Sequence, residues 1–354
     1  MEAQKCVVPF GALVTPRKVL PEMPVVPYDP VRCKGCAACL NPYARVDFTA
    51  KLWICPFCYT RNHFPQHYAS ISETNLPAEL FPTYTTIEYQ LQRPAAAPPA
   101  YLFVVDVCLI EEELGALKQS LTQALSLLPE NASVGLITFG THVHVHELGF
   151  DECPKSYVFR GSKEFTSQQI QDQLFRSAGG ARPAKPGQAA AASTGHQSKF
   201  LVPLADCEFQ LTSVLEELSR DSFSALPDCR PARCTGTAVS VAATLLASSV
   251  SNTPARALLF VGGPATDGGG QVVGKELETA MRSHKDIAKG AAPFMAKATK
   301  YYETVATQLC TNGHCLDVFA CSLDQVGLAE MKVCAEKTGG MVVLAESFAN
   351  TAFK

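Results

Sequence analysis

From Tyr101 onward, short apolar runs alternate with segments in which apolar residues recur every three or four positions. The run YLFVVDV is apolar almost throughout, which is typical of a strand buried on both faces. The next segment places leucines along one face of a helix, at Leu114, Leu117, Leu121, Leu125 and Leu128. This alternation predicts an α/β fold whose mostly parallel sheet is covered by helices on both faces.

The alternation continues to the C-terminus and predicts the remaining elements. Further strands are expected at SVGLITFG, VHVHEL, ARALLFVGG, LDVFACSLD and MVVLAES. Helices are expected at about 208–220, at TAVSVAATLLASSV, as one long helix around Ile287, Phe294, Tyr301 and Leu309, and at about 325–337 with Gly339 as its terminator. We therefore expect one α/β domain over residues 101–354.

Residues 176–199 interrupt this pattern. Their sequence, RSAGGARPAKPGQAAAASTGHQSK, is rich in Gly, Ala, Pro and Ser and contains no acidic residue and no large apolar side chain. Such a segment cannot bury enough apolar surface to offset the entropy lost when it orders. We expect a flexible surface insertion there.

The first hundred residues show no such alternation. Residues 1–30 are strand-like and interrupted by prolines, and no nearby segment would complete a sheet with them. We interpret them as a short N-terminal β segment, a fragment of a β unit. Residues 69–100 end in the Pro/Ala stretch RPAAAPPA and are expected to form a linker.

Between these segments, cysteines form two C-x2-C pairs, Cys33/Cys36 and Cys55/Cys58. Two thiolate pairs at this separation can surround Zn²⁺ with a tetrahedron of sulfurs, so we expect a four-cysteine zinc ribbon, or zinc finger, over residues 31–68. Four thiolates leave no position for water, which predicts one structural rather than catalytic zinc per chain. Cys39 complicates the choice of ligands, because Cys36-x2-Cys39 is a second possible pair.

Disulfides are the alternative use of these cysteines. The N-terminal sequence MEAQKCVVPF has no apolar signal core that would send the chain to an oxidising compartment. The fifteen cysteines of the chain therefore suit a reducing cytosol. No apolar run reaches the ~20 residues that cross a bilayer, so any membrane contact is expected to be peripheral.

Charge narrows the range of partners. The chain has 354 residues and a net charge of −3, which argues against a generally basic nucleic-acid-binding protein. Residues 31–61 differ, because they carry five Lys or Arg against Asp47 alone. Aromatic residues are interleaved with these cations, at Tyr43, Phe48, Trp53 and Tyr59. This module could contact RNA, DNA or anionic lipid, or its charges could form only a solvated rim.

The predicted first strand ends at Asp106, where von Willebrand type A domains carry D-x-S-x-S and hold Mg²⁺. Cys108 and Ile110 replace both serines, whereas Mg²⁺ needs oxygen ligands. Thr235 or Thr237 could still supply one oxygen, but the strand LLFVGG ends in glycine where an aspartate is needed. We expect a structural Asp106 and no divalent ion.

Three histidines, His142, His144 and His146, alternate along VHVHEL and should project from one face of a strand. They could ligate zinc, or the intervening valines could face the core while the imidazoles face solvent or loops. We favour the second interpretation, because only Glu147 could orient them and it should point away. No nucleophile or dinucleotide motif occurs, so no catalytic or cofactor-binding residue is assigned.

Several stretches together resemble one family. They are LNPYARVDFTAKLWICPFC, RNHFPQHYASISETNLPAELFP, FVVDVCLIEEELGALKQSL, LLPENASVGLITFGTHVHVHELGF, LLFVGGPATDG and TGGMVVLAESF. From about Val8 to the C-terminus they resemble the inner-shell, GTPase-activating subunit of the COPII vesicle coat, the Sec twenty-three family. In that family a zinc finger and a von Willebrand A-like trunk without a metal site precede the rest of a β-sandwich, a helical domain and a gelsolin-like domain.

The resemblance implies zinc ligation by Cys33, Cys36, Cys55 and Cys58 and a trunk over residues 101–354. It also implies that residues 1–30 are a β segment of an incomplete β-sandwich. It implies a coat component for transport from the endoplasmic reticulum to the Golgi, cytoplasmic and peripheral on the endoplasmic reticulum membrane and on COPII vesicles. The implied partners are a paralogous cargo-adaptor subunit, a GTP-bound small GTPase, outer-coat subunits and anionic membrane, with no nucleic acid.

In that family the GTPase-activating arginine comes from the C-terminal part, and no position in this chain can be matched to it. We therefore expect a non-catalytic coat subunit with little activating effect of its own. Two other classes of protein stay open: a zinc-ribbon nucleic-acid-binding protein and a metal-dependent von Willebrand A-type adhesion domain.

Overall fold

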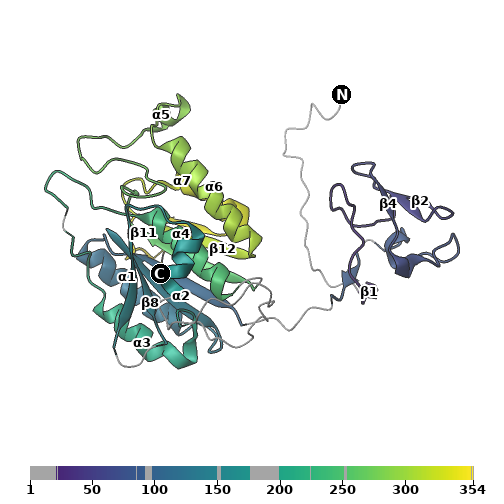
Figure 1. Ribbon diagram of the computed structural model, residues 1–354, viewed down its shortest axis with the longest axis horizontal. Helices are drawn as coiled ribbons and strands as arrows, with labels where there is room; N and C mark the ends of the chain where they lie inside the picture. The colour runs from purple at the N-terminus through teal and green to yellow at the C-terminus, as the bar shows by residue number, and fades with distance from the viewer. Residues whose placement is uncertain are drawn as a thin grey trace, which may run out of the picture. The chain divides into compact units, whose positions relative to one another are not determined.

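The computed structural model describes residues 21, 23–84, 86–91, 98–149, 153–175, 199–223, 225–250, 253–351 and 353. The chain divides into two compact units, Met1–Ala96 and Ala97–Lys354 (Figure 1). None of the described helices is long and apolar enough to span a bilayer.

A three-stranded antiparallel sheet organises the first unit. Its strands are β2 (Arg45–Asp47), β3 (Leu52–Ile54) and β4 (Arg61–His63), in the order β2-β3-β4. Trp53, on the central strand, is fully buried at the middle of a small core that also holds Cys33, Cys55 and Leu40. The chain has a single tryptophan, and it fills most of the space that three short strands can enclose.

Residues from the expected linker also belong to this unit. Short 3₁₀ turns at Gln66–Tyr68 and Ala78–Leu80 bring Ile71 and Leu80 into the same small core. Strand β5 (Glu88–Tyr89) pairs in parallel with β1 (Val25–Val26), so the end of the N-terminal β segment has a partner within this chain. Residues 1–20, 22 and 92–97 lie outside the described part.

The second unit is built on an eight-stranded sheet in the order β13-β12-β11-β6-β7-β8-β9. Its strands are β6 (Ala100–Asp106), β7 (Ser133–Phe139), β8 (His142–Glu147), β9 (Lys155–Arg160), β11 (Ala255–Val261), β12 (His314–Cys321) and β13 (Val342–Ala345), with β10 (Val202–Pro203) beside β7. The strands from β13 to β7 are parallel, whereas β8 and β9 form an antiparallel hairpin at one side. The predicted mostly parallel α/β sheet is confirmed.

Helices cover both faces of this sheet (Figure 1). On one face, α1 (Glu111–Leu125) and α3 (Leu204–Glu217) pack on Phe103 and Val105 of β6. On the other face, residues of α2 (Ser167–Phe175), α4 (Thr235–Ser249), α6 (Met295–Thr311) and α7 (Leu328–Thr338) share a core with Leu102 and Val104. Strand β6 therefore alternates its side chains between two cores, which explains why its sequence is apolar at nearly every position.

The predicted long helix around residues 287–309 is two helices instead. α5 (His284–Ala288) begins at a capping box in which Ser283 and Asp286 each satisfy the other's backbone N–H. The chain then turns at Gly290, which has a positive φ of 67°, before α6 begins at Met295. A glycine in this conformation and the following Pro293 interrupt a helix even where the apolar spacing continues.

The prediction that Gly339 terminates the last helix is confirmed. α7 ends at Thr338, and Gly339 adopts the left-handed conformation with a φ of 70°. The flexible insertion expected at 176–199 lies outside the described residues except for Lys199.

Candidate metal centre

The structure brings together the four cysteines of the two C-x2-C pairs. The sulfurs of Cys33, Cys36, Cys55 and Cys58 all lie within 4.8 Å of one another. The Cys33 and Cys58 sulfurs are 3.5 Å apart, and those of Cys36 and Cys55 are 3.6 Å apart. Zinc bound at about 2.3 Å by four thiolates separates the sulfurs by about 3.8 Å, so this cluster has the right size.

Both pairs reach this position through the same backbone turn. The amide of Ala37 donates to the carbonyl of Cys33 at 2.8 Å, and the amide of Tyr59 donates to the carbonyl of Cys55 at 3.0 Å. Ala37 and Tyr59 both have a positive φ, 58° and 57°, which is unfavourable for residues with a side chain. The two turns are local copies of one another, and each aims both of its sulfurs at the same point.

The surroundings lower the pKa of the Cys33 and Cys58 thiols, whereas at Cys36 a backbone hydrogen bond from Ala38 is outweighed by the neighbouring sulfurs and burial, which raise the pKa. Burial opposes ionisation of the Cys33 thiol, but amides of Cys36 and Gly35 and the side chain of Asn62 donate to its sulfur and lower its pKa to about 6. The Asn62 amide nitrogen lies 3.5 Å from this sulfur. Thiolates are the ligand form that zinc binds, so binding of the metal would displace the proton of the Cys36 thiol.

Cys39 lies outside this cluster. It is exposed, and its backbone forms an isolated bridge with Arg32. Four sulfurs already converge without it, so the alternative pair Cys36-x2-Cys39 has no role in the geometry. A metal held by four thiolates has no open position, and such a centre stabilises the fold rather than catalysing a reaction.

The second unit contains a different charged centre at the end of its central strand. Asp106 is fully buried, and one of its carboxylate oxygens, Oδ2, accepts hydrogen bonds from Nε of Arg233 at 2.7 Å and from the amide of Gly262 at 3.0 Å. Its other oxygen accepts from the amide of Cys108 at 2.8 Å. The guanidinium of Arg233 thus lies directly beside Asp106, the carboxylate that was considered above as a metal ligand.

The neighbouring loop makes room for this guanidinium. A Cβ added at Gly263 would come within 2.3 Å of Nη1 of Arg233. The backbone of Arg233 is held too, because its amide donates to Oγ1 of Thr266 at 2.9 Å. The glycines after strand β11, which the sequence indicated only as a loop, therefore have a definite role.

Neither of the two threonines that could have completed a metal site hydrogen-bonds to Asp106 in the described contacts. Oγ1 of Thr237 donates to the carbonyl of Gly161 at 2.9 Å, whereas the buried Oγ1 of Thr235 has no partner among the described residues. Asp267 forms an ion pair with Lys275 at 2.8 Å. These contacts support the expectation of a structural Asp106.

The three histidines of β8 lie on the face of the strand opposite the core, as the sequence predicted. Val143 and Val145 are fully buried, and the imidazoles occupy the other face of the strand. Nε2 of His146 lies 3.0 Å from Oγ1 of Thr138, and His142 packs on the ring of Phe223. In the part of the chain that the structure describes, only the cysteine cluster brings three or more metal-ligating atoms together.

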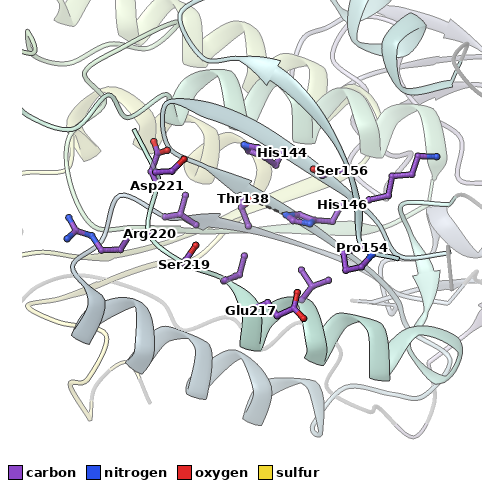
Figure 2. Close-up of a pocket in the computed structure, with 14 residues that line it drawn as sticks. Thr138, His144, His146, Pro154, Ser156, Glu217, Ser219, Arg220 and Asp221 are labelled. Carbon is purple, nitrogen blue, oxygen red and sulfur yellow. Dashed lines mark hydrogen bonds between the residues drawn. The ribbon is translucent and has the colours of Figure 1, made fainter. Parts of the chain in front are cut away.

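A cleft of about 310 Å³ opens beside these histidines. Figure 2 shows Thr138, His144, His146, Pro154, Ser156, Glu217, Ser219, Arg220 and Asp221 around it. Burial lowers the pKa of His146 to about 4 and also lowers that of His144, so both rings are neutral near pH 7. Asp221 accepts from the amide of Thr141 at 2.6 Å and so fixes a loop. The cleft offers hydrogen-bonding groups but no activated nucleophile.

Sequence reasoning missed Arg233 and Asn62. Arg233 precedes an apolar helix in a proline-rich loop, where nothing in the local pattern marks an arginine that reaches a buried aspartate 127 positions earlier. Asn62 alternates with Arg61 and His63 on an exposed-looking strand, and only the pairing of β3 with β4 turns it inward.

Comparisons with known proteins agree with these two units. Residues 30–68 match the Sec23/Sec24 zinc finger, and residues 96–354 match the Sec23/Sec24 trunk domain. The second match covers more than half of the chain.

Individual relatives show the same relationship. Protein transport protein SEC23 F of Arabidopsis thaliana is 52% identical over 361 residues, covering 100% of this chain and 47% of that protein. The chain thus spans about half the length of this relative. The crystal structure of the human COPII-coat protein Sec24c matches with a TM-score of 0.55 at 17% identity, over 94% of this chain and 43% of Sec24c.

A von Willebrand factor type A protein of Catenulispora acidiphila matches at a TM-score of 0.37 and 11% identity, over 73% of this chain and 41% of that chain. That likeness is too low to support a conclusion. The family matches and the relative at 52% identity confirm the resemblance found in the sequence. The chain belongs to the Sec23/Sec24 family, and it contains that family's zinc finger followed by its trunk domain.

Proposed function

We propose that this chain is the zinc-finger and trunk part of a Sec23-type subunit of the COPII coat, which acts in transport from the endoplasmic reticulum to the Golgi. The observation that carries this proposal is the 52% identity to a Sec23 protein along the entire chain, across both units. In this function the protein is cytoplasmic and peripheral on the endoplasmic reticulum membrane and on COPII vesicles.

In this proposal, Cys33, Cys36, Cys55 and Cys58 hold one structural zinc. The convergence of their sulfurs within 4.8 Å supports it, as does the match of residues 30–68 to the family's zinc finger. The small core of this unit needs such support, because three strands of three residues each cannot bury enough apolar surface by themselves. The metal supplies folding free energy, and the four cysteines supply the thiolates.

The trunk is proposed to pair with a Sec24-type cargo-adaptor subunit and to engage the GTP-bound small GTPase of the coat, with outer-coat subunits as further partners. The fold shared with human Sec24c indicates that such an adaptor offers a second domain of the same architecture. Contact with anionic membrane is proposed for the zinc finger, whose exposed Arg45 and Arg61 flank Ile54 on the outer face of its sheet.

We assign the GTPase-activating arginine to no residue of this chain. An activating arginine must be free to reach the phosphates of a bound nucleotide. Arg233 and Arg282 are instead buried in ion pairs with Asp106 and Glu330, and Arg256 forms a two-bond ion pair with Asp317. None of these three arginines is free to act as the activating group, and we propose that the chain serves mainly as a scaffold.

The test combines binding with a single-turnover GTPase assay. The chain and a full-length Sec23 protein are each incubated with a Sec24-type adaptor and the GTP-loaded small GTPase of the coat on anionic liposomes. We expect this chain to bind the adaptor and to stimulate hydrolysis far less than the full-length protein. Failure of the chain to bind either partner would refute the coat assignment, and equal stimulation would place the activating group within these 354 residues.

The nucleic-acid alternative is favoured by one observation. Phe57 and Tyr59 are 71% and 74% exposed in the second metal-binding turn, next to the strand that carries Arg61. Exposed aromatic rings beside arginines suit single-stranded nucleic acid as well as lipid. A filter-binding assay with a salt titration tests this alternative, and affinity that stays in the millimolar range at physiological salt would exclude it.

A further inference from the structure

The first unit contains a buried carboxylate surrounded by aromatic rings. Glu79 is 1% exposed. Its Oε1 accepts a hydrogen bond from the hydroxyl of Tyr68 at 2.7 Å, and its Oε2 accepts one from the hydroxyl of Tyr28 at 3.2 Å. Among the described residues, none forms an ion pair with this carboxylate. The charge of Glu79 is therefore hydrogen-bonded but not neutralised, and it attracts cations to this part of the unit.

The two tyrosines remain protonated. Burial and the hydrogen bond to Glu79 raise the pKa of Tyr68. Burial is also the main cause that raises the pKa of Tyr28, and the charge of Glu79 adds to it. Both phenols therefore donate to the carboxylate as neutral groups, and both rings keep the negative π faces that attract cations.

These two rings and a third line a small cavity. Tyr28, His67 and Tyr68 contribute to the wall of a cavity of about 170 Å³. The ring centroids of Tyr28 and Tyr68 are 6.1 Å apart with an interplanar angle of 84°, and those of Tyr28 and His67 are 5.6 Å apart at 51°. Rings at such angles present faces in different directions, as the walls of an aromatic cage do. Cages of this kind recognise quaternary ammonium groups.

Donors near this cavity suit an anionic group as well. Nζ of Lys51 donates to the carbonyl of Ile71, which is one of the lining residues. Oγ of Ser70, another lining residue, accepts from Nδ2 of Asn75 at 3.4 Å and keeps its own hydrogen to donate. A ligand with a cationic end and an anionic end therefore fits better than a lysine-rich peptide, whose additional cations Lys51 would repel.

We propose that this cavity binds a phosphocholine group, with its quaternary ammonium against the rings of Tyr28, His67 and Tyr68 and its phosphate toward Lys51 and Ser70. Glu79, hydrogen-bonded to two of the three rings, selects a cation over an uncharged group of the same shape. The site goes beyond the proposed coat function and does not depend on it. The phosphocholine group can belong to a lipid or to a soluble compound, and the experiment separates these two sources.

The experiment is a nuclear magnetic resonance titration of phosphocholine with the full chain. The comparison compound is its uncharged analogue, in which a tert-butyl group replaces the trimethylammonium. Glu79→Gln keeps the size of the side chain and an acceptor oxygen but removes the charge, and His67→Ala removes an exposed ring of the wall. Tyr84→Ala is the matched control, because this ring packs on Phe81 and does not line the cavity. Zinc content and circular dichroism establish that each variant is folded.

We expect phosphocholine to bind more tightly than its uncharged analogue. Glu79→Gln and His67→Ala should each weaken phosphocholine binding roughly threefold to tenfold, and Tyr84→Ala should leave it unchanged. Equal binding of the two compounds would overturn the proposal, and so would equal binding of phosphocholine by all the variants. A trimethyl-lysine peptide that binds where phosphocholine does not would show that the ligand is a modified protein instead.

Co-sedimentation with phosphatidylcholine vesicles identifies the source of the group. Vesicle binding that soluble phosphocholine competes away would assign the site to a lipid headgroup. Phosphocholine binding without vesicle binding would assign it to the soluble compound. All these measurements use the chain alone, so their failure is distinguishable from failure of the coat function, which is tested with the adaptor and the small GTPase.

Discussion

Nε of Arg233 lies 2.7 Å from Oδ2 of Asp106, with both side chains buried at the end of the central strand of the trunk. The guanidinium supplies a positive charge directly beside the buried carboxylate. A covalently attached cation cannot dissociate, so we expect the stability of this end of the sheet to be independent of the concentration of divalent ions.

Removing the arginine should destabilise the trunk strongly. Arg233→Ala leaves Asp106 buried and unpaired, which costs about 3–5 kcal/mol in comparable buried pairs. The double variant Asp106→Ala with Arg233→Ala should lose less than the sum of the two single variants. Urea unfolding of all three proteins gives the comparison, and additive losses would show that the two side chains are not energetically coupled.

The trunk should not bind Mg²⁺, and restoring the missing hydroxyls should not be enough to create a site. Cys108→Ser with Ile110→Ser supplies oxygen ligands, but the guanidinium of Arg233 still lies against Asp106. Weak binding is expected only when Arg233→Ala is added. Isothermal titration calorimetry tests each protein. Saturable Mg²⁺ binding by the natural chain that Asp106→Ala abolishes would contradict this interpretation.

Zinc content separates the four clustered cysteines from Cys39. The natural chain should contain one zinc, and Cys55→Ser should lose it and unfold the first unit, because metal binding and folding are one equilibrium in such modules. Cys39→Ser is the matched control and should retain the metal. Elemental analysis with near-ultraviolet circular dichroism of Trp53 reports both events, and zinc loss in the Cys39 variant would mean that the ligand set is wrong.

Stability should fall as the pH is lowered from about 6.5 to about 4. Burial lowers the pKa of His146 to about 4 in the folded protein, whereas an unfolded histidine titrates near 6.5. The unfolded state binds the additional proton in this window, so folding loses roughly 3 kcal/mol from this group. Burial lowers the pKa of His144 and His314 as well, which adds to the slope.

His146→Gln should flatten this dependence without removing it, because the other two histidines remain. Melting temperatures measured between pH 7 and pH 4 for the two proteins provide the test. Identical slopes would show that His146 is not the group that resists protonation.

Limited trypsin digestion should first cut within residues 176–199, at Arg176 or Arg182, because this segment has the composition of a contact-poor loop. Lys185 precedes proline and should resist. Lys199 should also be slow, since Nζ of Lys199 lies 3.5 Å from a carboxylate oxygen of Glu147 and over the ring of Tyr157. N-terminal sequencing of the first fragments decides, and an initial cut elsewhere in the trunk would contradict the prediction.

Features that depend on only a few neighbouring residues could be predicted correctly from the sequence. The leucine spacing of α1, the left-handed Gly339 and the two C-x2-C turns each depend on a few neighbouring residues, and the structure contains all of them. The contacts of Arg233 with Asp106 could not be predicted in this way. They depend on how distant strands align, which no short stretch of sequence specifies.

In the first unit, too, contacts between distant residues could not be predicted from the sequence. Ile71 and Leu80 look like isolated apolar residues of a linker, because nothing near them in the sequence is periodic. They are buried only because the chain folds back onto Trp53 and the metal-binding turns. The break between α5 and α6 was hidden for a related reason: the apolar spacing continues through Gly290, and it is the backbone at this one glycine that ends the helix.

The order β11-β6-β7 has a consequence for the time course of synthesis. Strand β6 is made early and gains β7 soon afterwards, but its other neighbour begins only at Ala255. At ~5–20 residues per second, a ribosome needs roughly 8–30 s to make the intervening ~150 residues. Throughout that interval, one side of the most apolar strand of the trunk has no partner strand. The nascent chain therefore needs to be bound by chaperones most in the period after β7 and before β11 has been synthesised.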